Sequence, residues 1–112
     1  MYRDFKHFLV DMADSAANID EFTKGYTYEQ FIADKKTASA VIRQFEILGE
    51  AAKNIPVDFK DRHPEIDWKR IAGLRDVLIH GYFGIDLEII WDIIQGKVPT
   101  LRAQLKIIIE KI

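Results

Sequence analysis

The polar side chains with the clearest chemical use lie in one stretch past the middle of the chain. Residues 73–83 read G-L-R-D-V-L-I-H-G-Y-F, and the polar residues that interrupt this apolar and glycine run are Arg75, Asp76, His80 and Tyr82. Arginine offers planar, permanently charged donors that suit a phosphodiester, and histidine moves a proton near neutral pH. RNA carries its own nucleophile, the 2′-hydroxyl, so its cleavage to a 2′,3′-cyclic phosphate needs a base, an acid and a cation but no metal or cysteine. The stretch therefore points to phosphate chemistry, and it holds the parts that such a cleavage of RNA needs.

Asp76 and His80 are one turn apart if this stretch is helical, because 100° per residue places them on the same face. A carboxylate at that position accepts a hydrogen bond from the imidazole, fixes its tautomer and favours its charged form. Such a pair orients a catalytic histidine. The two residues also fit an exposed i, i+4 pair of small energetic value, and the pattern alone leaves both interpretations open.

Arg75 emerges from an apolar side of the same predicted helix. The apolar residues around it are Trp68, Ile71, Ala72, Leu78, Ile79 and Tyr82, and Leu74 and Val77 add a further apolar side. A helix that is apolar around most of its circumference must be covered on nearly all sides. In so small a protein, a second copy of the chain can supply part of that cover. We therefore predict a homodimer with this helix near the two-fold axis, which brings two arginines and two histidines into one groove.

Apolar residues at helical spacing predict the elements that position this stretch. A first helix ends near Gly25, and a capping box formed by Thr27 and Gln30 starts the next helix. From Ala38 the helical spacing holds for about five turns and ends at Pro56. The apolar stripe of the first helix comprises Phe5, Phe8, Leu9, Met12, Ala16 and Ile19.

The second half of the chain reads as a loop followed by three helices. Residues 56–67 contain two prolines and four acids and predict a loop with one short turn. Asp67 is expected to cap a helix from Trp68 to Ile79 or His80, with Gly81 and Gly84 at its end. Asp86 is expected to cap the next helix, 87–95, which Gly96 closes. Pro99 suits the first turn of the last helix. No strand-like alternation is present. We predict an all-α fold, an antiparallel bundle of four to five helices.

Gly49 and Glu50 lie on the long helix that precedes Pro56. Gly49, together with Ala51 and Ala52, would let another helix approach closely. Glu46 and Glu50 are like charges one turn apart, so one of them is expected to meet a basic partner elsewhere. For Glu50 the residues leave two possibilities open, a pair with Arg75 or an exposed surface acid.

Length and composition exclude several classes of protein. The 112 residues suit one domain over 1–112, and 48% apolar with 30% charged residues is typical of a globular protein. There are no cysteines, and the three histidines have no ligand-like spacing, so we expect neither a metal site nor a cofactor. No apolar run reaches the roughly 18 residues of a membrane span, and no export signal is seen. We expect a cytoplasmic protein.

The sequence resembles HEPN-domain proteins of the HepT type, the toxin half of HEPN/MNT toxin–antitoxin systems. The resemblance covers nearly the whole chain. Besides the acidic N-terminal helix, it rests on A-V-I-R-Q-F-E-I-L-G-E-A-A-K-N at 40–54, H-P-E-I-D-W-K-R-I-A-G-L-R-D-V-L-I-H-G-Y-F at 63–83 and W-D-I-I-Q-G-K-V-P-T-L from 91. The R-x-x-x-x-H-x-Y signature in this order and context is the most specific part.

This resemblance implies a homodimeric, metal-independent endoribonuclease with Arg75 and His80 in a cleft between protomers. Asp76 stands where the family often has asparagine, which bears on the charge of His80. The resemblance also implies a cognate nucleotidyltransferase antitoxin that transfers AMP onto Tyr82. The added phosphate and nucleoside at the cleft would repel and exclude RNA.

Two other functions are compatible with the same residues. One is a non-catalytic helical dimer that binds a nucleotidyltransferase partner or a nucleotide, with the motif as its interface. The other is a structural adaptor in which the polar motif residues are replaceable. Tyr82 then becomes a core residue with its hydroxyl in water, as Trp68, Trp91 and Phe45 are expected to be core residues.

Overall fold

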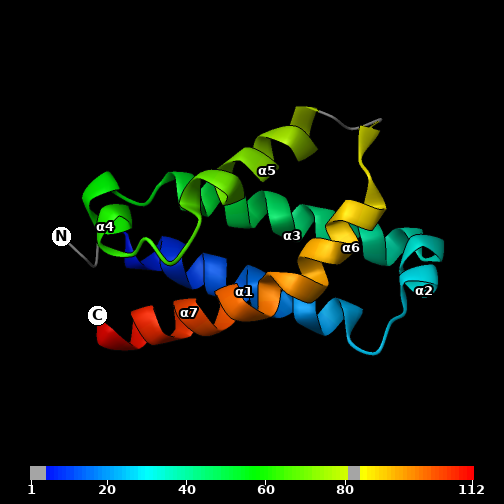
Figure 1. Ribbon diagram of the computed structural model, residues 1–112, viewed down its shortest axis with the longest axis horizontal. Helices are drawn as coiled ribbons and strands as arrows, with labels where there is room; N and C mark the ends of the chain where they lie inside the picture. The colour runs from blue at the N-terminus through cyan, green and yellow to red at the C-terminus, as the bar shows by residue number, and fades with distance from the viewer. Residues whose placement is uncertain (1–4, 81–83) are drawn as a thin grey trace.

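The computed structural model describes residues 5–80 and 84–112, with the backbone alone for His80. In this part of the chain it contains seven helices and no strand. Four long helices form the body: α1 (Lys6–Thr23), α3 (Lys35–Lys53), α5 (Trp68–His80) and α7 (Val98–Lys111). Figure 1 shows them side by side in the order α5, α3, α1 and α7, with neighbours antiparallel. The predicted all-α fold is confirmed.

The remaining helices connect this row. The ten residues of α6 (Leu87–Gly96) cross the bundle between α5 and α7. Two helices of six residues each, α2 (Tyr28–Ala33) and α4 (Val57–Arg62), lie at the ends of the bundle. The five longer helices match the predicted number. The segment 56–67, expected to be a loop with one short turn, instead contains α4.

The helix boundaries follow from capping residues. Gly25 closes α1 with a φ of +78°, which glycine adopts without a Cβ penalty. Thr27 Oγ1 accepts from the N–H of Gln30 at 3.2 Å, and Gln30 Oε1 accepts from the N–H of Thr27 at 2.9 Å, so the predicted capping box is confirmed. Asp86 Oδ1 likewise accepts from the N–H of Glu88 at 2.9 Å and caps α6. The predicted stop at Gly81 lies outside the described residues.

A cap at Asp34 separates α2 from α3 and was not predicted. Its carboxylate accepts from the N–H of Thr37 at 3.0 Å, from the Thr37 hydroxyl at 2.7 Å and from the Tyr26 hydroxyl at 2.8 Å. These hydrogen bonds, those from Thr37 first, lower the pKa of Asp34 to about 2. Because of this cap, α3 begins at Lys35, ahead of the first residue of the predicted spacing.

The hydrophobic core lies between α1, α3 and α7, with aromatic rings closing both ends. Phe59 of α4 and Phe31 of α2 are fully buried at these ends. Among the described residues of α5, only Trp68 and Leu78 are buried. Most of this helix therefore lies outside the core, with its other described side chains half-buried or exposed. The predicted core residues Trp68 and Phe45 are confirmed, and Trp91 is half-buried against Phe31. Within the described ranges, no helix has the length and apolar character needed to cross a membrane.

Candidate active site

The site begins where α5 crosses α3 at Gly49. A Cβ at position 49 would collide with the Cβ of Arg75 and would lie 2.9 Å from the carbonyl oxygen of Ile71. The absent side chain therefore allows the two helices to approach until the base of Arg75 rests on the α3 backbone. The close helix approach predicted at Gly49 is confirmed.

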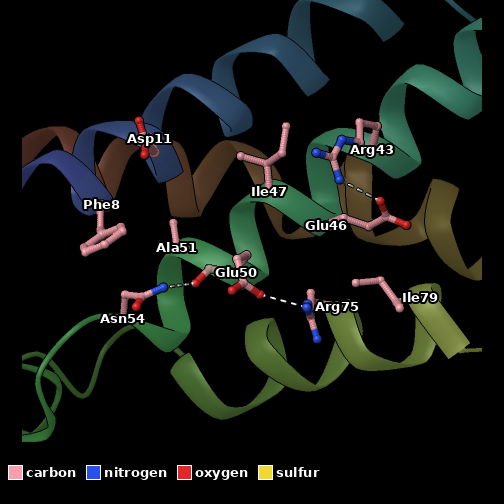
Figure 2. Close-up of a pocket in the computed structure, with 10 residues that line it drawn as sticks. All are labelled: Phe8, Asp11, Arg43, Glu46, Ile47, Glu50, Ala51, Asn54, Arg75 and Ile79. Atoms are coloured by element: carbon pink, nitrogen blue, oxygen red, sulfur yellow. Dashed lines mark hydrogen bonds and ion pairs between the residues drawn. The ribbon is translucent and has the colours of Figure 1, made fainter.

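The guanidinium of Arg75 is held by two carboxylates. Nη2 lies 2.9 Å from Oε2 of Glu50, and Nη1 lies 2.9 Å from Oδ1 of Asp76. The side chain is 24% exposed, and its Nε is buried with no hydrogen bond to a described residue. Glu50 forms the ion pair with Arg75 (Figure 2), and its side chain is at the same time 56% exposed, so both possibilities for this residue are met. Arg75 is thus the basic partner that was expected for one of the two acids Glu46 and Glu50.

Asp76 joins a second cation to this cluster. Its Oδ1 also accepts from Nζ of Lys53 at 3.0 Å, so one oxygen bridges Lys53 and Arg75. The hydrogen bonds from Lys53 and then from Arg75 lower the pKa of Asp76. Lys53 was not among the predicted site residues. It lies one turn after Gly49 on α3, so the glycine that marks the helix crossing could have pointed to it.

Two predicted residues fall wholly or partly outside the described structure. The backbone of α5 ends at His80, one turn beyond Asp76, but the His80 side chain is not described. Tyr82 lies outside the described residues. The hydrogen bond between Asp76 and His80, the catalytic role of His80 and the modification of Tyr82 therefore stay predictions.

A cavity of about 210 Å³ adjoins Arg75. Its residues come from the first half of α1, from α3 and from α5, and Figure 2 shows them arranged around the central helix α3. The lining residues are Phe8, Asp11, Arg43, Glu46, Ile47, Glu50, Ala51, Asn54, Arg75 and Ile79. Arg43 pairs with Glu46 inside it at 3.2 Å. The contribution of α1, through Phe8 and Asp11, was not predicted.

The described residues offer no group of three or more histidine, cysteine, aspartate or glutamate side chains that could hold a metal ion. They do bring together two cations and two carboxylates: Asp76 contacts both Arg75 and Lys53, and Glu50 contacts Arg75. A phosphate that reached this site would compete with Glu50 for the guanidinium. The two cations and two carboxylates balance in formal charge, so an anion can bind Arg75 only by replacing one of its carboxylate partners.

Comparison with known proteins identifies the family. A family model described as Ribonuclease HepT-like matches residues 12–108. The chain belongs to the HepT-like ribonuclease family. This confirms the resemblance inferred from the motifs, and the match includes the stretch 73–83 that carries Arg75 and His80.

Curated HepT-like relatives cover nearly the whole chain. A protein of Thermococcus cleftensis named probable ribonuclease HepT is 48% identical over 104 residues, which are 93% of this chain and 94% of the relative. A protein of Methanocaldococcus jannaschii, named as a candidate RNase, is 47% identical over 110 residues, 98% of this chain and 91% of the relative. A second protein of that organism with the same kind of name is 44% identical over 106 residues, 95% and 97% of the two chains. No solved structure gives a significant match.

Proposed function

We propose that the protein is a metal-independent endoribonuclease that cuts RNA in a cleft between two protomers. Membership of the HepT-like ribonuclease family supports ribonuclease function. The observation that carries the proposal within the chain is the Arg75 guanidinium, which two carboxylates hold at the edge of a cavity. Arg75 is pre-positioned for an anion, because Asp76 still fixes Nη1 when a phosphate oxygen replaces Glu50 at Nη2.

In the proposed reaction the ribose 2′-oxygen attacks the adjacent phosphorus and the bond from phosphorus to the 5′-oxygen breaks. His80 takes the proton from the 2′-hydroxyl, and an acid, the second His80 of the dimer, gives a proton to the departing 5′-oxygen. The products are a 2′,3′-cyclic phosphate and a 5′-hydroxyl. Arg75 donates to the non-bridging oxygens, whose negative charge grows in the transition state. Asp76 orients His80 through the i, i+4 spacing.

The dimer in this proposal uses α5. Val77 and Ile79 on this helix are 63% and 39% exposed, so the single chain leaves apolar α5 surface uncovered beside Arg75. A second copy covers it most simply by placing its own α5 there, around a two-fold axis. This is the geometry that brings two copies of the motif into one groove.

The proposed regulation is a toxin–antitoxin pair. A nucleotidyltransferase partner transfers AMP to the hydroxyl of Tyr82, two residues after His80. The bond formed is between the tyrosine oxygen and the α-phosphorus of ATP, and pyrophosphate leaves. The modified tyrosine brings negative charge and a nucleoside to the cleft and excludes RNA.

The decisive experiment measures cleavage of a labelled RNA in the presence of a chelator. We expect cleavage by the unchanged protein and by Arg70→Ala, a matched control because Arg70 is an exposed arginine of α5 paired with Asp67. We expect loss of cleavage in Arg75→Ala and His80→Ala. Full activity in both variants, with the dimer intact by sedimentation, would remove the catalytic assignment. A dimer that cuts no RNA would favour the non-catalytic binding module.

Co-expression with a nucleotidyltransferase encoded beside this protein tests the regulation. We expect the mass of the chain to rise by one AMP group and RNA cleavage to cease. Tyr82→Phe keeps the ring and removes the acceptor oxygen, so it should gain no mass. Modification of Tyr82→Phe to the same extent would assign the AMP to another residue.

A further inference from the structure

The cavity beside Arg75 presents an aromatic ring and a carboxylate that the proposed reaction does not use. Phe8 and Asp11 are three residues apart on α1, so both face the cavity from the same side of that helix. Phe8 is half-buried, packs against the core and has its ring centroid 3.9 Å from that of His7, which leaves the cavity side of the ring for a ligand. Ile47 and Ala51 supply apolar surface from α3. The cavity volume of about 210 Å³ is below the roughly 300–1,000 Å³ of pockets that bury drug-sized ligands. It is suited to a single planar ring system.

Two of the three carboxylates that line this cavity are already paired. Glu46 is paired with Arg43, and Glu50 is paired with Arg75. Asp11 is exposed and has no hydrogen-bond or ion-pair partner among the described residues. The remaining polar side chain, Asn54, donates its Nδ2 to the backbone oxygen of Glu50 at 2.9 Å, which leaves its Oδ1 to accept.

We propose that this cavity is a subsite for guanine in a nucleotide next to the cleaved bond, with Phe8 against the face of the base and the Asp11 carboxylate accepting from N1–H and the 2-amino group. Guanine is the base whose Watson–Crick edge carries two neighbouring donors, which match the two oxygens of a carboxylate. Uracil offers one N–H between two carbonyl oxygens that the carboxylate repels. Adenine and cytosine each place one amino group beside a ring nitrogen acceptor. Stacking of a base on an aromatic side chain adds affinity for every base and leaves the discrimination to Asp11.

The subsite rests on the proposed ribonuclease function, because it lies on the path of an RNA strand whose phosphate reaches Arg75. Arg75 lines the cavity at its α5 side, and Phe8 and Asp11 line it from α1. A strand that crosses α3 from the α5 side to the α1 side therefore brings a phosphate to the guanidinium and a neighbouring base to the ring. Such a subsite adds selectivity for a base to a cleavage site that otherwise contacts only phosphate and ribose.

The experiment uses 2′-O-methyl oligonucleotides with one ribose, so that a single bond can be cut. Three oligonucleotides are compared, which carry guanosine, inosine or uridine at the two positions on each side of that bond. Hypoxanthine, the base of inosine, is guanine without the 2-amino group. We expect the guanine oligonucleotide to be cut about tenfold faster than its inosine counterpart, the scale of one hydrogen bond to a charged group, and uracil to be slowest. In Asp11→Asn the ratio of guanine to inosine should fall to about one. Asp14→Asn, the same charge change one turn along α1 at an exposed residue outside the cavity, should keep the ratio.

A binding measurement separates the subsite from the catalytic proposal. Fully 2′-O-methylated oligonucleotides cannot be cut, and their dissociation constants give the same guanine-to-inosine ratio without turnover. Cleavage with no preference for guanine, or a preference that Asp11→Asn retains, overturns the subsite and leaves the ribonuclease assignment standing. An Asp11-dependent preference in binding without any cleavage supports the subsite and overturns the ribonuclease. Circular dichroism of each variant checks that the helix content of the protein is unchanged.

Discussion

Glu50 and Arg75 meet where α3 and α5 cross, with Oε2 of the glutamate 2.9 Å from Nη2 of the arginine. The contact joins the residue proposed to bind phosphate to an acid that any phosphate must displace. Asp76 holds the other terminal nitrogen, Nη1, at the same distance. The guanidinium is therefore oriented by one carboxylate and blocked by the other.

Replacing Glu50 with glutamine should tighten RNA binding. The change removes the competing charge while Asp76 keeps Arg75 in place. The Glu50 side chain is half-exposed, and ion pairs of this kind contribute about 1 kcal/mol or less, so we expect the dissociation constant of an uncleavable RNA at low salt to fall by at most about fivefold. Glu29→Gln, an exposed acid on α2, gives the same change in net charge as a control. Weaker binding in Glu50→Gln than in the control would mean that Glu50 orients Arg75 rather than competing for it.

Adding one methyl group at Gly49 should separate α5 from α3. In Gly49→Ala the new Cβ meets the Arg75 Cβ and the Ile71 carbonyl oxygen, and overpacking of this kind costs about 1–3 kcal/mol. We expect a lower free energy of unfolding in urea and reduced RNA cleavage, because Arg75 moves with α5.

Gly73→Ala is the matched control for that variant. Position 73 lies in α5, the helix that packs against Gly49, and it is exposed with no atom within 4 Å of an added Cβ. Alanine is favoured over glycine inside a helix by about 0.5–1 kcal/mol, so this variant should be more stable than the unchanged protein. Equal destabilisation by both alanines would show that the close approach at Gly49 does not hold α5 in place.

The cap at Asp34 should make the stability of the fold depend on acid pH. The pKa of this carboxyl is lowered to about 2 by its hydrogen bonds, so it stabilises the folded state above the ordinary carboxyl pKa of about 4, and that contribution is lost as the pH falls from about 4 to about 2. Asp34→Ala should lower the melting temperature at pH 7 and have little effect at pH 2. Asp34→Asn keeps an oxygen that accepts from the Thr37 N–H and should lose less at pH 7. A loss in Asp34→Ala that is the same at both pH values would contradict the role of the ionised cap.

The helices were predictable because their signals are local. Thr27 and Gln30 are three residues apart, and Asp86 caps the residues that directly follow it, so each boundary is encoded within one turn. Asp34 was missed because part of what holds it comes from Tyr26, eight residues earlier and on the other side of α2. A single short apolar pattern also does not reveal that α2 and α3 are separate helices.

The partners within the site were less predictable than its members. The motif itself marks Arg75 and Asp76, but Lys53 is 23 residues away from Asp76 along the chain. Which residues of α3 meet α5 depends on where the helices cross, and that is set by the fit of Gly49 against Arg75 rather than by local pattern. For the same reason, the partner of Glu50 could not be decided from the sequence, and the position of Phe8 and Asp11 of α1 beside the cavity was not predicted.

Asp76 should influence the charge state of His80, the predicted catalytic histidine. Asp76 is one turn before His80 on α5, and its Oδ1 is shared by Lys53 and Arg75. A carboxylate at this spacing favours the charged imidazole, and Lys53 partly neutralises that carboxylate. Asp76→Asn should therefore move the pH–rate profile of RNA cleavage to lower pH, and Lys53→Met, which keeps the aliphatic stem, should move it to higher pH. Because the groups are half-exposed and screened by salt, each shift should be a few tenths of a pH unit at low ionic strength. Shifts in the same direction, or a profile that changes only in amplitude, would show that Asp76 acts by holding Arg75 and not through His80.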